Sequence, residues 1–536
     1  MGRFAACVIL CSFGCSGGDD GPGGDAGPLE PPRPACMAAA VGSTTVAAPA
    51  LKYTLADRWQ EAWLGSPAVI DLDGDGTTEV IAPRHELLLV WRIGADGSIS
   101  EAWRHAFTDR IWAPPVVADF SPTRDGLEVI VASRGELIAL DANGGTLVHF
   151  PKTWQDELRS VAAGDIDGNG TLEAVAVTTT PLEANGQRDI IFATTYTGGI
   201  YAGFPANTSG AAGCDDACYV TGGYDQNLAI GDVDGDGRSD VFATQDNAYM
   251  SLHDGTGRAF DAASIFDGRT KFSGIRWMVD YALAQQGYPD TPATDLQAHF
   301  TNTAPAIADL DGDGTAELIA LGSIQNAAQD EREHGVGLFV AHADGTRPAG
   351  WETPPLYRDF LSGLWDPGDN LVGVTNEVAV ADIDPAHAGL ELVFAGFDGK
   401  LHAVAADATK LWDVPYTTSD AEWTSGVAIA DLSGDGSPEL VLTTYSATGG
   451  DLIILDAMGT VLHRVPLGGR GAMPVPTVAD ADNDGDLDIT ISLKDAVDRQ
   501  QSVLIYEVPG SSTNCLPWPT GRGNYRRDGY VPPASQ

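Results

Sequence analysis

Residues 71–79 read DLDGDGTTE, and this stretch decides how the chain folds. Glycines stand at its positions 4 and 6, where a tight loop needs backbone with positive φ. Alternate side chains of such a loop point toward one centre, and Thr77 adds a backbone carbonyl. Oxygen ligands with several negative charges suit Ca²⁺, which takes about six to eight of them. Because the strand-like run EVIAP follows in place of a helix, we expect a strand–calcium loop–strand unit with the ligands Asp71, Asp73, Asp75 and Glu79.

The same nine-residue pattern recurs five more times along the chain. Some copies carry serine or asparagine in place of a carboxylate, but every copy keeps oxygen-bearing side chains at positions 1, 3, 5 and 9. The ligands predicted in these copies are Asp165, Asp167, Asn169 and Glu173; Asp232, Asp234, Asp236 and Asp240; Asp309, Asp311, Asp313 and Glu317; Asp431, Ser433, Asp435 and Glu439; and Asp480, Asp482, Asp484 and Asp488.

Two further copies are altered. DFSPTRDGLE from Asp119 and DIDPAHAGLE from Asp382 are one residue longer and carry proline at position 4. Because the proline replaces a glycine of the turn, we expect these loops to bind Ca²⁺ weakly or not at all. The eight loops start 46 to 77 residues apart, and repetition at such a period is typical of a repeat architecture.

Each repeat reads as four strands. In the first repeat, SPAVI leads into the loop, TEVIAP leaves it, LLLVWRIGADG ends at a glycine turn and SISEAWRHAF carries aromatic residues. The loop with these flanking strands resembles the FG-GAP/VCBS repeat family, which is also seen in the propellers of integrin α-subunits. The resemblance runs from about Lys52 to the C-terminus, and it implies a β-propeller with one calcium loop per blade. We therefore expect an all-β, eight-bladed β-propeller of four-stranded blades; seven blades with one irregular unit is the alternative.

The two ends of the repeat region complement each other. The eighth unit has no clean fourth strand, whereas residues 54–63 (TLADRWQEAW) resemble a fourth strand that lacks a unit. Joining them closes the ring and removes an exposed strand edge.

In the long insertion before the fifth unit, helical spacing predicts a helix over residues 275–286. We expect this helix to pack on the rim of the ring, and a binding lid is the alternative. Its apolar face comprises Ile275, Met278, Val279 and Ala282.

The chain is strongly acidic, with 75 Asp and Glu against 30 Lys and Arg and a formal net charge of −45. This balance argues against nucleic acid and anionic membrane surfaces as partners. Crowded carboxylates repel one another and need a cation. We therefore interpret much of the charge as metal ligand; an acidic surface that keeps the protein soluble is the alternative.

The N-terminus has the pattern of an export signal, in which Arg3 precedes an apolar run, residues 4–13, that is too short to span a bilayer. SFGC at residues 12–15 resembles a bacterial lipobox, with Ser12 where leucine is usual, and makes Cys15 the predicted lipidation site. An ordinary cleaved secretory signal is the alternative. We divide the chain into a signal peptide (1–15), a Gly/Pro-rich tether (16–50) and a propeller (51–536). We expect an exported protein that is lipid-anchored to the cell envelope, at a bacterial outer membrane or the cell surface.

Four cysteines remain after the signal peptide is removed and Cys15 is acylated. An even number in an exported protein is typical of disulfides. Cys214 and Cys218 are close in sequence, which favours a local bridge, and Cys36 would then pair with Cys515 and join the chain ends. A zinc site is the alternative, although no histidine lies near these cysteines in sequence.

Catalytic motifs are absent from the sequence, which holds no nucleophile elbow, no HExxH, no phosphate loop and no metal-type CxxC pair. We interpret tryptophans such as Trp63, Trp103, Trp112 and Trp412 as blade packing rather than as a platform for sugars. The sequence favours a binding or adhesion scaffold for an extracellular protein or glycan. The alternative is an enzyme on a similar ring, either a polysaccharide lyase or a quinoprotein-like dehydrogenase, although the adjacent cysteines of the latter are missing. Arg, Lys and His gathered at the central mouth would favour a lyase.

Overall fold

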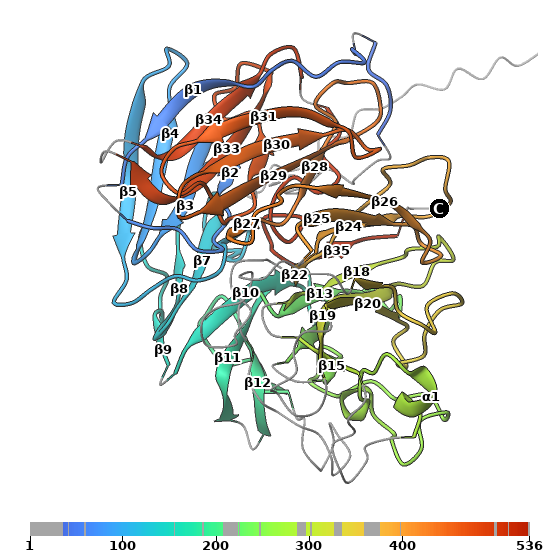
Figure 1. Ribbon diagram of the computed structural model, residues 1–536. Helices are drawn as coiled ribbons and strands as arrows, with labels where there is room; N and C mark the ends of the chain where they lie inside the picture. The colour runs from blue at the N-terminus through green and yellow to red at the C-terminus, as the bar shows by residue number, and fades with distance from the viewer. Residues whose placement is uncertain are drawn as a thin grey trace, which may run out of the picture.

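Each acidic loop joins the two innermost strands of one sheet, and the sheets are arranged around a common axis (Figure 1). The computed structural model describes residues 36–40, 42–57, 60–154, 156–184, 187–206, 223, 226–245, 248–286, 296–300, 303–325, 335–357, 376–396, 398–497, 501–512 and 514–533. The prediction of an all-β, eight-bladed propeller is confirmed, and the seven-bladed alternative is wrong. The signal peptide, Cys15 and the pair Cys214 and Cys218 lie outside the described residues.

The sheets follow one another in chain order, and neighbouring blades contact each other through their inner strands. Blade 1 comprises β2 (Ala68–Ile70), β3 (Glu79–Arg84), β4 (Leu87–Ile93) and β5 (Ile99–Ala106). Blade 2 comprises β6 (Val116–Ala118), β7 (Glu128–Ser133), β8 (Glu136–Leu140) and β9 (Lys152–Thr153). Blade 3 comprises β10 (Leu158–Gly164), β11 (Glu173–Ala184) and β12 (Gln187–Thr194), and blade 4 comprises β13 (Leu228–Gly231), β14 (Asp240–Thr244) and β15 (Met250–His253).

The second half of the ring is built in the same way. Blade 5 comprises β18 (Ala306–Ala308), β19 (Glu317–Gln325), β20 (Val336–Ala341) and β21 (Leu356–Tyr357), and blade 6 comprises β23 (Ala379–Ala381), β24 (Glu391–Ala395), β25 (Lys400–Val404) and β26 (Lys410–Pro415). Blade 7 comprises β28 (Ala428–Ala430), β29 (Glu439–Ser446), β30 (Gly450–Leu455) and β31 (Val461–Leu467). Blade 8 comprises β32 (Thr477–Ala479), β33 (Leu487–Val497), β34 (Gln501–Val508) and the N-terminal strand β1 (Ala50–Leu55).

Short strands extend this frame: β16 (Gln297–His299) pairs with β19, β17 (Thr303–Ala304) pairs with β22 (Asn376–Glu377), β27 (Glu422–Thr424) pairs with β29, and β35 (Tyr530–Val531) pairs with β18.

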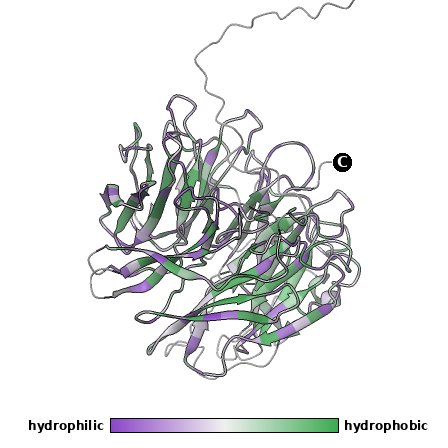
Figure 2. Cartoon of the chain, turned by 90° about the horizontal axis from the view of Figure 1, so that it is seen from above, coloured by the Kyte–Doolittle hydropathy of each residue, from purple (hydrophilic) through white to green (hydrophobic). Residues whose placement is uncertain are grey.

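Hydrophobicity determines where each strand lies within its blade. Inner strands are short and apolar, as in VVA of β6 and AIA of β28, and are fully buried. Second strands such as β7 (EVIVAS) are buried along their whole length because neighbouring blades cover both faces. The outer strand β5 is exposed or half-buried throughout. Viewed from above, hydrophobic residues run along the strands (Figure 2).

The N-terminal strand completes the last blade. β1 pairs antiparallel with β34, so the predicted closure of the ring by strand exchange is confirmed. The strand begins and ends earlier than the predicted range 54–63, because Asp57 leaves the sheet and forms a buried ion pair with Arg84 of blade 1. Residues 42–49, which the sequence assigned to the tether, already lie against the ring, and Val46 is buried against the core of blades 7 and 8.

Cys36 and Cys515 form a disulfide across 479 residues, which confirms the predicted bridge between the two ends of the chain. Next to it, the N–H of Ala39 donates to the carbonyl of Gly434 at 2.7 Å, and the N–H of Ser43 donates to the carbonyl of Ser433 at 2.9 Å. The N-terminal segment is therefore held against the acidic loop of blade 7.

The C-terminal tail lines the inside of the ring, and we call residues 515–531 the C-terminal plug. Backbone N–H groups of inner strands donate to successive plug carbonyls, and the Tyr525 hydroxyl donates to the carbonyl of Val69 in blade 1 at 2.9 Å. The pairs, donor first, are Ile429 in blade 7 with Trp518, Val478 in blade 8 with Pro519, Val117 in blade 2 with Tyr525, Ala163 in blade 3 with Arg526, Ile230 in blade 4 with Asp528, and Ile307 in blade 5 with Gly529. The plug thus pairs the inner strand edges that a propeller otherwise leaves open.

The insertion between blades 4 and 5 contains little helix. A 3₁₀ turn, η1 (Phe272–Gly274), precedes a single helical turn, α1 (Tyr281–Ala284). The prediction of a helix over residues 275–286 is wrong for its first half, because Arg276 bridges to Tyr249 of blade 4 and Met278 bridges to Gln297 of β16. Unpaired strand edges of two blades therefore override the helical spacing. The expected burial holds for Ile275 and Met278.

Candidate metal centres and a candidate binding surface

The six regular acidic loops share one backbone fold. In the first loop, the N–H groups of Gly74 and Gly76 each donate to an oxygen of Asp71 at 2.8 Å, and the N–H of Leu72 donates to Glu79 at 2.8 Å. Gly74 and Gly76 have φ values of 74° and 85°, which explains the glycines of the motif. In all six loops a position-6 N–H donates to position 1, and a position-2 N–H donates to position 9.

This backbone brings the carboxylates at positions 1, 3 and 9 together. In five loops one oxygen from each of the three lies within 4.8 Å of the others; these groups are Asp71, Asp73 and Glu79; Asp165, Asp167 and Glu173; Asp232, Asp234 and Asp240; Asp309, Asp311 and Glu317; and Asp480, Asp482 and Asp488. The loop that starts at Asp431 has Ser433 at position 3, but Asp431 and Glu439 keep the shared hydrogen bonds. The acidic groups can therefore hold a metal ion.

The side chain at position 5 lies outside these groups. It accepts a hydrogen bond from the N–H two residues further on, as Asp75 does from Thr77 at 2.8 Å. A short carboxylate or amide readily forms this local turn. The same bond occurs at Asn169, Asp236, Asp313, Asp435 and Asp484.

The two proline-bearing loops differ. Glu128 accepts hydrogen bonds from the N–H groups of Phe120 and Ser121, at 3.0 and 2.9 Å, and Glu391 is bound in the same way in blade 6. Neither loop, both of which the structure describes in full, forms a group of three carboxylates. The longer turn directs the last carboxylate to the backbone.

Burial makes the acidic groups costly without a cation. Glu173 and Asp240 are 2% and 3% exposed. Burial and the neighbouring carboxylates raise the pKa of Glu173 to about 7 and that of Asp240 to about 8. In blade 8, Asp480 and Asp488 each keep one buried oxygen that has no hydrogen-bond partner among the described residues. A bound cation would satisfy these oxygens, so the residues present fit a metal ion.

Basic side chains enter some of these groups. Lys52 of β1 contacts Asp482 at 2.7 Å and also pairs with Asp484 and Glu507. In blade 1, Arg92 reaches the first loop, and in blade 5 the Nδ1 atom of His342 lies 3.4 Å from Glu317. These loops therefore differ from one another in the charge that a metal ion would meet.

At the opposite face of the ring lies a cluster that we call the Trp112 surface, which comprises Trp63, Arg110, Trp112, Arg159 and Lys494. It lies opposite the acidic loops because Trp63 and Trp112 precede inner strands whose far ends lead into those loops. The ring centroids of Trp63 and Trp112 are 5.3 Å apart. The Arg110 guanidinium lies 4.9 and 4.7 Å from the two rings, Arg159 lies 4.0 Å from Trp112, and Lys494 lies 3.4 Å from Trp63.

Both tryptophans of this surface are half-buried. Trp63 packs against Leu64, Tyr445 and Met473, and its indole N–H donates to Glu61 at 2.9 Å. The indole N–H of Trp103 instead donates to Ala142 of the next blade at 2.8 Å, and that of Trp412 donates to Ala457 at 3.0 Å. The interpretation as blade packing therefore holds for Trp103 and Trp412. The Trp112 surface was missed because blade-end tryptophans look alike in sequence.

The centre of the ring is occupied by the arginines of the plug. Arg522 and Arg527 are 1% and 0% exposed. Arg527 donates to the carbonyls of Pro67 and Pro115 at 3.0 Å, while Arg522 donates to Val161 at 2.9 Å. Basic residues do gather at the centre, but they stabilise the plug and are closed to solvent.

The fold matches solved propellers at low sequence identity. The V. cholerae biofilm matrix protein Bap1 has a TM-score of 0.53 and 14% identity, over 91% of this chain and 97% of that chain. The rhamnogalacturonan lyase YesW has a TM-score of 0.47 and 15% identity, over 88% and 76% of the two chains. The quinohemoprotein alcohol dehydrogenase of Comamonas testosteroni has a TM-score of 0.48 and 13% identity, over 89% and 79%. The likeness to Bap1 shows the propeller fold alone.

No protein-family model matches the chain, and no curated protein matches it. Among the described residues, no helix has the length and apolar character needed to cross a membrane.

Proposed function

We propose that this chain is a calcium-stabilised propeller that binds an extracellular protein or glycan through the Trp112 surface. The carrying observation is the pair Trp63 and Trp112 with Arg110 against both rings. Tryptophan and arginine are enriched among the residues that dominate binding energy. The parts of these half-buried indole rings that the neighbouring side chains leave uncovered also offer apolar surface to a sugar or an apolar side chain. This surface spans several blades, so it needs the closed ring to keep its shape.

Calcium is the cation we assign to the acidic loops. Every ligand atom is an oxygen and each group carries several negative charges, which suits Ca²⁺ better than metals that prefer nitrogen or sulfur. The resemblance of the loops to FG-GAP/VCBS repeats supports this choice. When bound, the ion would neutralise the carboxylates and tie the inner strand of each blade to the second strand.

We prefer binding to catalysis as the function. The lyase alternative would be favoured by accessible cations at the central mouth, whereas Arg522 and Arg527 are buried and hydrogen-bonded. The cations of the Trp112 surface are also paired, since Arg110 and Lys494 lie 3.0 and 3.4 Å from Glu61. An enzyme on this ring is the alternative, but no group among the described residues favours it.

Display on the cell envelope is part of the proposal, and it rests on the N-terminal sequence. A lipid on Cys15 and the tether behind it would hold the propeller near the membrane without inserting it. Replacing Cys15 by Ser should release the protein from the membrane fraction. Retention of the variant together with lipid labelling would contradict the lipid anchor.

A glycan and protein array probed with the full chain, with and without Ca²⁺, tests the binding function. We expect bound features that require Ca²⁺ and that are lost in Trp112→Ala. The matched control is Trp103→Ala, which removes a half-buried tryptophan from the outer strand β5. Equal binding by Trp112→Ala and the wild type would overturn the assignment of this surface, and a folded, Ca²⁺-loaded chain that binds no feature would overturn the function.

A further inference from the structure

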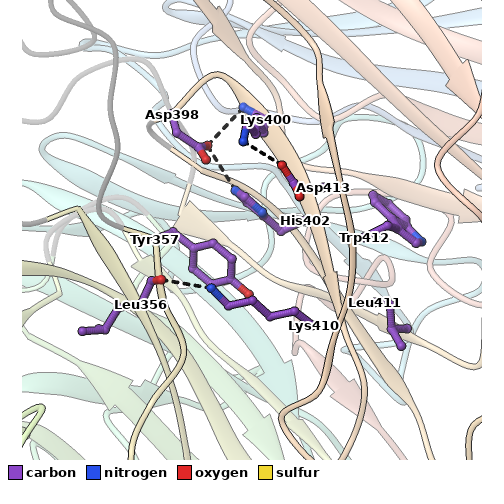
Figure 3. A pocket seen from close by; sticks show the side chains of 9 residues that line it. All are labelled: Leu356, Tyr357, Asp398, Lys400, His402, Lys410, Leu411, Trp412 and Asp413. Carbon is purple, nitrogen blue, oxygen red and sulfur yellow. Dashed lines mark hydrogen bonds and ion pairs between the residues drawn. The ribbon is translucent and has the colours of Figure 1, made fainter.

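A cavity of about 260 Å³ lies between blades 5 and 6, away from the acidic loops and the Trp112 surface (Figure 3). Its polar lining comprises Tyr357 from β21, Lys400 and His402 from β25, Lys410 and Asp413 from β26, and Asp398 from the turn before β25. At about 30 Å³ per water molecule, the cavity holds roughly nine waters, which is the size of one sugar ring.

A hydrogen bond and an ion pair hold one side of the cavity in place. His402 is 3% exposed, and its Nε2 atom lies 3.1 Å from Asp398. Lys400 pairs with Asp413 of the neighbouring strand at 2.7 Å. Lys400 and His402 are two residues apart on one strand and so point to the same face. This side is therefore a frame that contains both donors and acceptors.

The other side presents two hydrogen-bond donors, Tyr357 and Lys410, that have no carboxylate partner among the described residues. Tyr357 is 7% exposed, its ring centroid lies 4.1 Å from that of His402 with the rings tilted by 46°, and its hydroxyl has no hydrogen-bond partner among the described residues. Burial raises the pKa of Tyr357, so the hydroxyl keeps its proton and remains a donor. A buried hydroxyl without a partner is costly, which indicates that a ligand completes it.

Lys410 is the second donor. Its ammonium lies 4.0 Å from the centroid of the Tyr357 ring and donates to the carbonyl of Leu356 at 3.1 Å. Within the described residues no carboxylate lies within 4.0 Å of it. Figure 3 shows Lys410 beside Tyr357, whereas the Trp412 indole points away from the cavity.

We propose that this cavity binds a hydroxylated carboxylate of the size of one sugar ring, a hexuronate. The carboxylate would accept hydrogen bonds from Lys410 and Tyr357, since an anion next to both donors satisfies the ammonium and the buried hydroxyl together. The ring hydroxyls would meet the frame of Asp398, His402 and Asp413, which contains both donors and acceptors. The ligand is either a free uronic acid or a uronate residue within a polysaccharide. The proposal extends the binding function to a chemically defined ligand at a second site.

Isothermal titration of the full chain with glucuronate and galacturonate tests this, with the neutral sugars glucose and galactose as counterparts. We expect at least one uronate to bind in about the millimolar range and its neutral counterpart about tenfold more weakly. Tyr357→Phe removes only the hydroxyl and Lys410→Met only the charge, and each should weaken uronate binding about tenfold. The control is Lys152→Met, because Lys152 also lies near an aromatic ring, that of Phe150 at 5.9 Å, but on blade 2.

Equal uronate affinity in the wild type, Tyr357→Phe and Lys410→Met would overturn the proposal, as would the absence of any uronate binding by the folded wild type up to about 50 mM. Methyl glycosides of the same uronates identify the source: a cavity for a polysaccharide residue accepts them, and one for the free acid does not. Array binding that Tyr357→Phe retains but Trp112→Ala loses would leave the proposed function standing even if uronate titration fails. Uronate binding by a chain that binds no array feature would support the uronate cavity and contradict the proposed function.

Discussion

Arg92 enters the first acidic loop and lies against Glu79, with its Nε atom 2.6 Å from the Glu79 carboxylate. Its Nη2 atom lies 2.7 Å from Asp73, so the guanidinium bridges two of the three carboxylates that would bind a metal ion. Lys52 contacts one of the three carboxylates of the blade 8 loop, that of Asp482, at 2.7 Å. In these two loops a side-chain cation and a metal ion would compete for the same oxygens.

Arg92→Gln should therefore raise the affinity of the first loop for Ca²⁺ by about tenfold, because the incoming ion no longer displaces a positive charge. Isothermal titration of the metal-free chain would resolve this as one additional tight site. Arg104→Gln is the control, since Arg104 pairs with Glu101 on the outer strand of the same blade. Weaker Ca²⁺ binding by Arg92→Gln would mean that the guanidinium orders the site instead of occupying it.

His253 predicts a pH dependence of stability that is independent of the metal groups. It is 0% exposed at the end of β15, and neither ring nitrogen has a hydrogen-bond partner among the described residues. Burial lowers its pKa to about 4, below the ordinary value of about 6.5. The folded state thus favours the neutral ring. This contribution is complete above about pH 6.5 and is lost as the pH falls toward 4, by up to about 3 kcal/mol.

His253→Phe should remove that part of the acid destabilisation. Urea unfolding of the metal-free chain at about pH 7 and about pH 4.5 would show a loss of unfolding free energy that is about 2 kcal/mol smaller in the variant than in the wild type. The carboxylates titrate in both proteins, so their effect cancels. His387→Phe, at an exposed position, should behave like the wild type. An identical loss of free energy in all three proteins would show that His253 is not the group responsible.

The sequence was sufficient for the blades because their signal is local. Asp71, Gly74, Gly76 and Glu79 lie within nine residues, and hydrogen bonds within the loop hold all four in place. Position 5 shows the limit of this locality, because Asp75 forms a short-range turn with Thr77 and lies outside the group of three carboxylates, and its role as a metal ligand stays a prediction. A metal ion and a local turn compete for that side chain, and the residue type alone does not decide between them.

The plug could not be predicted in the same way. Arg527 contacts Pro115 across 412 residues, and its segment has no periodic pattern. The available signal was compositional, a run rich in arginine and glycine (GRGNYRRDG) at the end of a strongly acidic chain. Such arginines must meet carbonyls or carboxylates if they are buried. The helix predicted at 275–286 is wrong in its first half for a similar reason, because that segment bridges to strands distant from it in sequence.

Arg527→Met should destabilise the ring strongly. The variant leaves the carbonyls of Ser66, Pro115 and Gly521 without their arginine donor, and each unsatisfied buried group costs about 1–3 kcal/mol. We expect a loss of at least about 3 kcal/mol in the unfolding free energy from urea titration. Arg526→Met is a matched control from the same segment, because that side chain is 39% exposed and the loss of its ion pair with Asp528 costs about 1 kcal/mol or less. Equal effects of the two substitutions would contradict the role of Arg527 as the centre of the plug.

The closure of the ring leads to the last prediction, which concerns the Cys36–Cys515 disulfide. The two cysteines are 479 residues apart, and in the chain-entropy model a loop of this length contributes about 6 kcal/mol as an upper figure. It also starts the plug, since the carbonyl of Cys515 accepts the N–H of Asp431 at 2.9 Å. Replacing both cysteines by serine should therefore lower the unfolding free energy and loosen the chain where the two ends meet.

Hydrogen exchange of the double variant locates this loosening. We expect faster exchange in β1, in the loop of residues 431–439 and in residues 515–520, because Ala39 and Ser43 donate to that loop and the plug begins beside it. Blade 4 lies far from the disulfide along the ring, so β14 and β15 should exchange at the wild-type rate. Reduced wild-type protein should show the same local pattern, and any further change on reduction would come from other cysteines. Exchange that rises equally in blade 4 and in β1 would mean that the bond stabilises the chain only globally and does not hold the junction, which would refute closure by this disulfide.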